Sequence, residues 1–568
     1  MCADGTTAGL SITSSDGTWS YSRSGSGPAW TTTITDPAGN QTVAYFDNTS
    51  SSTSGLYETE RKIYQGAVGG NLLRDKLTCY NGAAMPCNST AIALPITRRT
   101  SQFTVGSLVA KTDVFLNSLG LVTEVDDYDW GSVLLRKSIT TYAALGNNIS
   151  NRPASVVLQN AAGGTVSSTT YSYDQTAVTA SGSPQLLTIS GSRGNATTIS
   201  SGGLSTTLTY FDNGNVQTFT DPKLSVYSYT YAACGNSLLT QISKPLGLSK
   251  SQGWNCTGGV RTSVTDENGQ PTSIAYNDPY FWRPASSQDA LGNTRYMTYT
   301  SPTQAGASMT FNSGISINNV VSILNSVGQS HLSQVQQAPG SSYYDTTEVL
   351  YSWVSSGRQV KNILPFTTTL GGTNPNGPNV TTVADALGRP VSVSGSGGGS
   401  LTYSYSLNDA LGTLGPSPVG ENSKQKQVEY NAFGWPTSVC EITSTQPGGG
   451  SACNQNTAAT GFRTSYIYDA MGNLTGVTQG AQSRSYSYDS LARMTSETAP
   501  EGGTVTYVWD TDASCNTTSL GDLIRVAKAD GNNVCYYYDA LHRVTDIGAN
   551  NNGVCYADVG IVMTTLRV

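Results

Sequence analysis

A seven-residue motif decides the fold that we predict for this chain: YDAMGNL at residues 468–474, YDSLARM at 488–494 and YDALHRV at 538–544. Between the second and third copies, Trp509-Asp510 has the form of a degenerate fourth copy. Self-similarity of this kind is typical of proteins that repeat one supersecondary unit. We therefore interpret the motif first as a building unit, and each of its residues by its place in that unit.

Each copy has the pattern of a β-hairpin turn. Large residues occupy alternate positions before it, as at Tyr466, Tyr468, Tyr486 and Tyr488, which is typical of a strand with one buried face. The aspartate can accept hydrogen bonds from the backbone amides that follow it. A glycine three residues later supplies the positive φ of a type I turn with a bulge. His542 replaces this glycine in the third copy, and histidine enters that region of φ more readily than most residues do.

Weaker copies of the turn occur throughout the chain. Their template is Asp or Asn, two further residues, Gly, and then Asn, Arg, Gln or an apolar residue. The template matches DPAGN (36–40), NSLGL (117–121), DENGQ (266–270), DALGN (289–293), NSVGQ (325–329), DALGR (385–389), DALG (409–412) and NAFGW (431–435). FDNGN (211–215) reads as a copy shortened by one residue, and SWVSSGR (352–358) keeps Gly-Arg without the acid. The residue before the glycine is usually apolar, so we expect it to pack on the neighbouring repeat.

The repeats predict one array over residues 1–568, with diverged repeats in 1–205, recognisable repeats in 206–440 and the strongest repeats in 441–568. Within it, residues 48–110 and 150–205 fit the template poorly, and we expect diverged hairpins with long loops there. Residues 315–336 could be mistaken for a helix, but the NSVGQ turn predicts a hairpin. Exposed loops are expected at residues 371–378, 394–400 and 415–423.

Composition supports an all-β fold. Charged residues make up only 12% of the 568 residues, whereas glycine (61) and tyrosine (32) are abundant, which favours turns and strands over long helices. The net charge of −7 argues against a nucleic-acid partner, because phosphate binding requires clustered Lys and Arg. No apolar stretch approaches the length of a membrane span.

The ten cysteines fall into local pairs around loops rich in Gly, Asn or Pro. Disulfides are the favoured interpretation, with free thiols as an alternative; a metal site is disfavoured because the tight Cys-x2-4-Cys spacing of zinc sites is absent. The expected pairs are Cys79 with Cys87, Cys234 with Cys256, Cys440 with Cys453, and Cys515 with Cys535 or Cys555, which leaves over Cys2 and one cysteine of the last group. Disulfides would imply an oxidising compartment. The chain starts without a signal peptide, and both of its ends read as cuts through a longer protein; the sheet edges of a cut array predict poor solubility or association.

The motifs Tyr-Asp-Ala-x-Gly-Asn-Leu and Tyr-Asp-x-Leu-x-Arg-Met/Val resemble the YD repeats of the Rhs family. This family includes bacterial Rhs and wall-associated proteins, the C components of insecticidal toxin complexes and the YD shell of teneurins. The resemblance implies a β-sheet of YD hairpins that spirals into a hollow shell, complete or as an open fragment. In toxin-bearing members such a shell encloses a variable C-terminal toxin. The shell-closing Asp-Pro-x-Gly segment is expected late in the chain, whereas DPAG (36–39) belongs to an early repeat, so no self-cleaving aspartate is assigned.

No catalytic, cofactor-binding or metal-binding residue is predicted. His331 and His542 are the only candidates for a Ser-His-Asp or Cys-His arrangement, and both lie in or beside repeat turns. The repeat aspartates recur at every copy, which favours turn formation over the paired acids of a glycosidase. The cluster Asp126-Asp127-Tyr128-Asp129 is interpreted as a solvated loop, with calcium binding as the alternative. The repeat tyrosines are interpreted as cross-strand ladders, with stacking on sugar rings as the alternative.

The predicted function is therefore that of a non-enzymatic structural shell of an Rhs-type secreted or cell-surface protein. It would encapsulate or display a C-terminal toxin or effector domain that is absent from this sequence. The alternative is a cell-surface module that binds carbohydrate or mediates adhesion. The expected partners are an enclosed toxin domain or a surface glycan or protein, without nucleic acid, membrane span or cofactor.

Overall fold

The computed structural model describes residues 9–26, 29–48, 56–88, 90–184, 186–278, 280–416, 419, 423–444, 451–453, 456–551 and 556–560. Strands dominate this part of the chain, and its helices are two single 3-10 turns, η1 (Trp130–Ser132) and η2 (Pro245–Gly247). The predicted all-β fold is confirmed. Cys2 and Cys555 lie outside the described residues, as does most of the loop expected at 415–423.

The chain divides into two structural units, each built from two separate segments. Unit 1 comprises Met1–Leu135 and Asn293–Thr464, and unit 2 comprises Arg136–Gly292 and Ser465–Val568. The same hairpin turn occurs in all four segments. The grouping of the repeats into 1–205, 206–440 and 441–568 concerns their divergence in sequence and stays a prediction.

Unit 1 contains the strands β1 (Gly9–Ser14), β2 (Gly17–Ser26), β3 (Ala29–Thr35), β4 (Gln41–Asn48), β5 (Leu56–Gln65), β6 (Asn71–Tyr80), β7 (Arg98–Val105), β8 (Leu108–Leu116), β9 (Val122–Asp129), β22 (Thr294–Ser301), β23 (Gln304–Phe311), β24 (Ser316–Leu324), β25 (Ser330–Gln336), β26 (Tyr343–Val354), β27 (Gly357–Thr369), β28 (Asn379–Ala384), β29 (Pro390–Gly395), β30 (Ser400–Ser406), β31 (Asp409–Gly415), β32 (Lys424–Tyr430), β33 (Pro436–Ser444), β34 (Ser451–Cys453) and most of β35 (Asn456–Tyr468).

Unit 2 contains most of β10 (Val133–Tyr142), then β11 (Pro153–Asn160), β12 (Thr165–Tyr173), β13 (Ala196–Ser201), β14 (Leu204–Tyr210), β15 (Val216–Thr220), β16 (Val226–Ala233), β17 (Leu238–Ser243), β18 (Ser249–Asn255), β19 (Val260–Thr265), β20 (Pro271–Tyr276), β21 (Pro284–Gln288), β36 (Leu474–Gln479), β37 (Gln482–Tyr488), β38 (Met494–Ala499), β39 (Gly503–Asp512), β40 (Thr517–Ala527), β41 (Asn532–Tyr538), β42 (Val544–Asn551) and β43 (Tyr556–Gly560).

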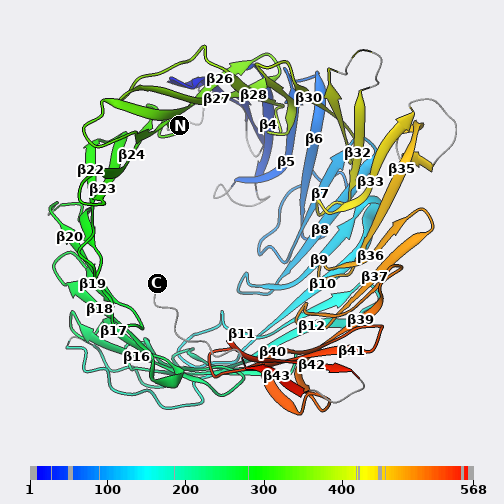
Figure 1. Cartoon of the computed structure of the whole chain (residues 1–568). Coiled ribbons are helices and arrows are strands. Elements are labelled where there is room, and N and C mark those ends of the chain that lie inside the picture. The colour runs from blue at the N-terminus through cyan, green and yellow to red at the C-terminus, as the bar shows by residue number, and fades with distance from the viewer. Residues whose placement is uncertain are drawn as a thin grey trace. The chain divides into compact units, whose positions relative to one another are not determined.

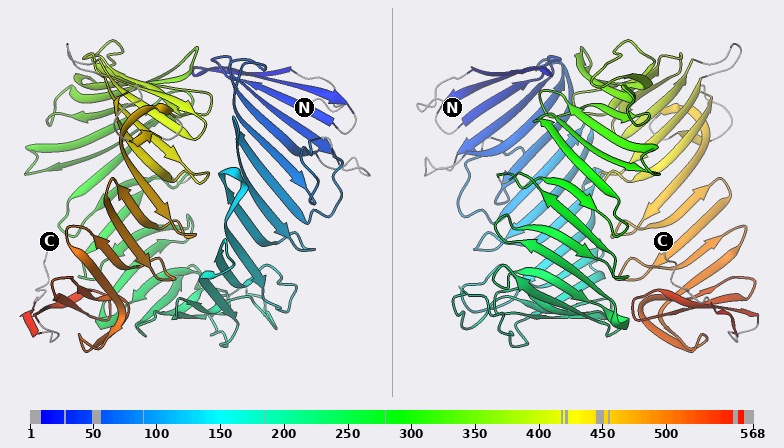
Figure 2. Two further views of the ribbon diagram at one scale, coloured as in Figure 1. Left: turned by 90° about the vertical axis from the view of Figure 1, so that its right-hand side faces the viewer. Right: turned by 60° about the vertical axis from the view of Figure 1, so that its left-hand side comes forward.

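Within each unit, the strands pair with their neighbours in sequence. The colour in Figure 1 and Figure 2 therefore changes gradually from strand to strand inside each segment. The described pairings between these strands are antiparallel, and the register shifts by a bulge where a strand meets a repeat turn. In β37 and β38 the shift falls at Tyr488, which pairs with Met494 across the turn. This geometry is the predicted type I turn with a bulge.

Several expectations for particular ranges are confirmed. Residues 315–336 form the hairpin β24–β25 around the Asn325 turn. The poorly matching ranges form hairpins with long loops, at residues 81–97 between β6 and β7 and at 174–195 between β12 and β13. Residues 371–378 form the loop between β27 and β28, and residues 396–399 form the turn between β29 and β30.

Three predicted copies of the turn are wrong or incomplete. DALG (409–412) lies inside β31, where pairing with strands on both sides holds it extended. Trp509 and Asp510 lie at bulges within β39 and form no turn. FDNGN (211–215) is not shortened: Phe211 stands at the position of the aspartate, and Gly214 N–H donates to the Phe211 carbonyl oxygen at 3.0 Å.

Disulfides are confirmed at Cys79–Cys87, Cys234–Cys256, Cys440–Cys453 and Cys515–Cys535. Three of them form the centres of small buried clusters. In unit 2, for example, Cys515 and Cys535 pack with Ile524, and each of the three is at most 3% exposed. A hairpin array that lacks a thick core thus gains local cores from its cross-links.

Candidate functional site

The repeated carboxylate fixes the hairpin turn. At Asp469, one oxygen (Oδ1) accepts hydrogen bonds from the backbone amides of Met471 and Asn473, both at 2.9 Å. The Gly472 amide closes the turn on the Asp469 carbonyl oxygen at 3.1 Å. The same bonds to residues two and four positions on are made by Asp36, Asp266, Asp385, Asp489, Asp539, Asn117, Asn325 and Asn431. The predicted turn-forming role of these residues is confirmed.

An arginine after the turn links one hairpin to the next. Arg493 Nε donates to Asp489 Oδ2 in its own turn at 2.7 Å. Its terminal nitrogens donate to both oxygens of Asp510 on β39, at 3.0 and 2.7 Å, and its guanidinium lies 4.9 Å from the ring centre of Trp509. Partial burial would raise the pKa of Asp510, but the hydrogen bonds from Arg493 and the Gly521 amide, together with the charge of Arg493, outweigh burial and lower this pKa below its usual value.

The repeat tyrosines and tryptophans donate hydrogen bonds from their O–H and N–H groups to backbone carbonyl oxygens. Tyr405 donates to the Pro390 carbonyl oxygen at 2.7 Å, and Tyr538 donates to that of Leu523 at 2.8 Å. Each acceptor lies on the strand that precedes the aromatic residue. Burial raises the pKa of Tyr538 to about 12. Since these hydroxyls are engaged by the sheet, the arrangement supports a structural role of the repeat tyrosines over stacking on sugars.

Side chains of the first segment contact repeat turns of the second segment in each unit, and we call these contacts the seam. In unit 1, Gln65 Nε2 donates to the Ser356 carbonyl oxygen at 2.7 Å, and Gln65 Oε1 accepts from the Ala386 amide at 3.0 Å. Asp129 Oδ1 accepts from the Ala432 amide at 2.8 Å. Ala386 and Ala432 each follow the Asp or Asn of a repeat turn. The seam side chains therefore bind the backbone of the turn and not its side chains.

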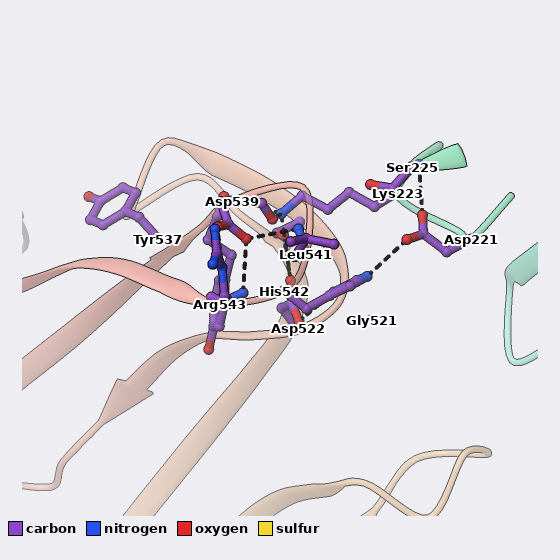
Figure 3. Close-up of polar contacts among 12 residues, drawn as sticks. Asp221, Lys223, Ser225, Gly521, Asp522, Tyr537, Asp539, Leu541, His542 and Arg543 are labelled. Atoms are coloured by element: carbon purple, nitrogen blue, oxygen red, sulfur yellow. Dashed lines mark hydrogen bonds and ion pairs between the residues drawn. The ribbon is translucent and has the colours of Figure 1, made fainter. Parts of the chain in front are cut away.

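The seam of unit 2 contains a cluster of charged side chains on a repeat turn, shown in Figure 3. His542 Nδ1 lies 2.9 Å from Oδ1 of Asp522, in the middle of β40, and His542 Nε2 lies 3.2 Å from Asp221 Oδ2 in the first segment. Lys223 donates to the carbonyl oxygens of Tyr538 and Asp539, at 3.2 and 2.6 Å. The turn that carries His542 is thereby held by side chains from both segments.

The charges around His542 favour its protonated form. Partial burial would lower the pKa of His542, but its contacts with the carboxylates of Asp522 and Asp221 outweigh burial and raise this pKa above the usual value of 6.5. Lys223 Nζ lies 3.8 Å from Asp522 Oδ2 and offsets part of the negative charge. Asp539 is occupied by Arg543, whose Nε donates to it at 2.7 Å.

This geometry leaves no ring nitrogen of His542 for proton transfer to a substrate. A Ser-His-Asp arrangement needs one nitrogen on a carboxylate and the other on a nucleophile, whereas both nitrogens of His542 face carboxylates. His331 Nδ1 lies 3.2 Å from the Val349 carbonyl oxygen, and its Nε2 lies 3.9 Å from the buried Glu348. The contacts of both histidines support the structural role predicted for them.

The acidic cluster at 126–129 is not the solvated loop that we predicted. Asp126 is buried in strand β9, and Asp129 ends that strand, where it accepts from the Trp130 amide at 2.8 Å in addition to its seam contact. In the described ranges, no group of three or more His, Cys, Asp or Glu side chains is arranged to hold a metal ion. No helix among these residues is long and apolar enough to span a membrane.

The prediction that the apolar residue before the repeat glycine packs on a neighbouring repeat holds only in part. Leu491 packs against Gly202 of the other segment of unit 2, where a Cβ atom on the glycine would lie 2.5 Å from the leucine side chain. Leu119 and Leu291 occupy the same position in their turns but are 64% and 88% exposed. The apolar residue before the glycine is therefore packed where a residue of the other segment lies against it, as Gly202 does at Leu491.

Two further turns fixed by an Asp or Asn side chain were not predicted from the sequence. Asp221 forms the same turn with Leu224 at the glycine position, φ 68°, and Ser225 N–H donates to Asp221 Oδ1 at 2.9 Å. Asn160 forms another with Gly163 at that position and Gly164 N–H donating to Asn160 Oδ1 at 2.9 Å. The Asp-Pro at 221–222 and the Gly-Gly at 163–164 are turn signals that could have revealed them.

These features define an all-β array of hairpins whose turns are fixed by one carboxylate and tied together along seams. No family model and no curated protein matches the sequence. Solved structures share the fold: chains in the crystal structures of TcdB2-TccC3 (TM-score 0.66, 9% identity), TcdB2-TccC3-TEV (0.67, 8%) and TcdB2-TccC3 without hypervariable C-terminal region (0.67, 8%). The alignments cover 94% of this chain but only 38 to 40% of those chains.

At so low an identity, the likeness is one of fold. The predicted resemblance to the repeat chains of toxin complexes is confirmed at this level. The chain spans about two fifths of the length of the structures that it matches.

Proposed function

We propose that this chain is a non-enzymatic structural part of an Rhs-type protein that encloses or displays a C-terminal toxin or effector domain. The observation that carries the proposal is the fold likeness to TcdB2-TccC3 chains over 94% of the sequence. One of the matched structures is described as lacking a hypervariable C-terminal region, so a chain of this fold can carry such a region.

The use of the polar side chains supports a structural role. The repeat aspartates are engaged in turns, Arg493 links two hairpins, and both histidines contact carboxylates or backbone. An acid or base poised for catalysis needs a free reacting atom in reach of a substrate, which these groups do not offer. The four disulfides support a place in an oxidising compartment, which is consistent with secretion or display at the cell surface.

The source genome provides the first test. Translation past Val568 should continue in frame with further repeats and then a region that varies between strains. A stop codon directly after Val568 would overturn the enclosure of a C-terminal domain. If the frame continues, limited proteolysis of the full-length protein should leave the variable region intact until the repeat array is cleaved.

A further inference from the structure

Residues of β30 to β33 and Phe462 of β35 line a hollow on one face of the sheet in unit 1. Figure 1 labels β30, β32, β33 and β35. Its volume is about 770 Å³. Ala410 and Gly412 form its floor on β31, because these small residues alternate with side chains that point to the other face. Leu401 and Tyr403 on β30 form one wall: they are the cross-strand partners of Leu414 and Gly412.

Two lysines form the opposite wall. Lys424 and Lys426 on β32 are the cross-strand partners of Leu414 and Gly412, so they lie on the same face as the hollow. Neither lysine forms an ion pair or a side-chain hydrogen bond with any residue that the structure describes. Glu441, the cross-strand partner of Lys426 on β33, also lines the hollow, so one carboxylate stands beside the two lysines at its outer side.

Apolar surface is open to solvent in the same place. Leu414 is 53% exposed, and Phe462, at the β35 end of the hollow, is 68% exposed. An open apolar hollow with unpaired cations along one side is complementary to a ligand that is apolar on one side and anionic on the other.

The dimensions favour a polypeptide in extended conformation. From Ala410 to Leu414 the floor runs four residues, about 14 Å at the rise of a β-strand. The two lysines lie two positions apart in the sequence, which is also the spacing of side chains on one side of an extended peptide. We propose that this hollow binds an extended peptide segment of a partner protein in which acidic residues alternate with apolar ones. The acidic side chains would face Lys424 and Lys426, and the apolar ones Leu401 and Tyr403.

This inference goes beyond the structural role proposed above and does not depend on it. Its test uses fluorescence anisotropy with the full 568-residue chain and three labelled synthetic peptides: Leu-Glu-Phe-Glu-Leu, Leu-Lys-Phe-Lys-Leu and Ser-Glu-Ser-Glu-Ser. The first should bind, and the other two should bind at least about tenfold more weakly, because each lacks either the charge or the apolar contact.

Two variants locate the binding. Gly412→Val fills the floor, and the fold should tolerate it, since a Cβ atom there would lie 3.5 Å from the Tyr403 ring, an ordinary contact. The double variant Lys424→Glu/Lys426→Glu reverses the charge of the wall without touching the floor. Each should weaken binding of the first peptide by about tenfold or more. Ser404→Val, on the opposite face of β30, is the matched control and should bind like the unchanged protein.

The peptides and the charge-reversed variant make the outcome decisive. Binding of Leu-Lys-Phe-Lys-Leu by the double glutamate variant, at the expense of Leu-Glu-Phe-Glu-Leu, would support the proposal strongly. Failure of the unchanged protein to bind the first peptide would overturn it. Unchanged affinity in the double variant would overturn it as well, even if Gly412→Val proved unable to fold.

Discussion

Replacing Arg493 with methionine should destabilise the β38–β39 hairpin far more than the same change at Arg543. Methionine keeps most of the aliphatic stem but removes every hydrogen bond of the guanidinium. Arg493 is 17% exposed and donates to two carboxylates, Asp489 and Asp510. Arg543 stands at the same place in its own turn, is 50% exposed and pairs with Asp539 alone.

The loss of stability in each variant depends on the carboxylates that remain without their arginine. Removing one partner of a buried ion pair costs about 3–5 kcal/mol, whereas exposed pairs contribute about 0–1 kcal/mol. Asp510 would lose both bonds to Arg493 but keep the one that it accepts from the Gly521 amide at 2.6 Å, and it is 20% exposed. We therefore expect a loss of about 3 kcal/mol for Arg493→Met and less than about 1 kcal/mol for Arg543→Met.

Native-state hydrogen exchange is the suitable assay, because a long repeat array does not unfold in a single two-state step. The amides of β38 and β39 should exchange about 100-fold faster in Arg493→Met, which corresponds to about 3 kcal/mol, while the same strands stay protected in Arg543→Met. A double-mutant cycle with Asp510→Asn should show a coupling of more than about 1 kcal/mol. Equal effects of the two methionine variants would refute the view that this arginine links successive hairpins.

Three further outcomes are expected. The contribution of His542 to stability should be fully present below about pH 6.5, its usual pKa, and should be lost as pH rises through its raised pKa. The hydrogen-exchange rate at its turn should therefore increase with pH more steeply than the intrinsic exchange rate does. The variant His542→Gln should abolish this additional increase. Asp469→Ala should destabilise its hairpin by about 2 kcal/mol, because two amides lose their acceptor, whereas Asp469→Asn should cost less than half of this, as native-state hydrogen exchange of β35 and β36 in the two variants would show. Replacing Cys515 and Cys535 with serine should cost about 3 kcal/mol for a loop with a sequence separation of 20, measured by native-state hydrogen exchange of β40 and β41; unchanged exchange there would show that the bond does not form.

The sequence predicted the hairpin turn correctly because its chemistry is local. An Asp or Asn followed by a residue that accepts positive φ contains nearly all the information for the turn, and the structure bears this out from Asp36 to Asp539. The local pattern fails where strand pairing overrides it, as at Asp409, which lies extended in β31. It also fails where an unexpected residue takes the glycine position, as Leu224 does.

The seams could not be predicted from the sequence, for a different reason. Their partners are far apart: 303 residues separate Asp129 from Ala432, and 321 separate both Gln65 from Ala386 and Asp221 from His542. A sequence repeat of 20 to 30 residues does not predict contacts between residues that are this far apart. The side chains that reach across carry no motif of their own, since glutamine, aspartate and arginine are ordinary surface residues.

The chemistry of the seams explains how repeats of such different sequence can follow one plan. At most seam contacts the second segment offers backbone atoms: the amides of Ala386 and Ala432, and the carbonyl oxygens of Ala470 and Asp539. Every residue supplies these atoms, so the side chains of a repeat can change without breaking the seam, provided that the turn is kept. Side chains of the second segment take part at other contacts: His542 reaches Asp221, Leu491 packs on Gly202, and Arg358 lies 3.8 Å from Asp16. Selection on the turn alone would maintain the backbone contacts, whereas the contact of His542 depends on a particular side chain and on its proton.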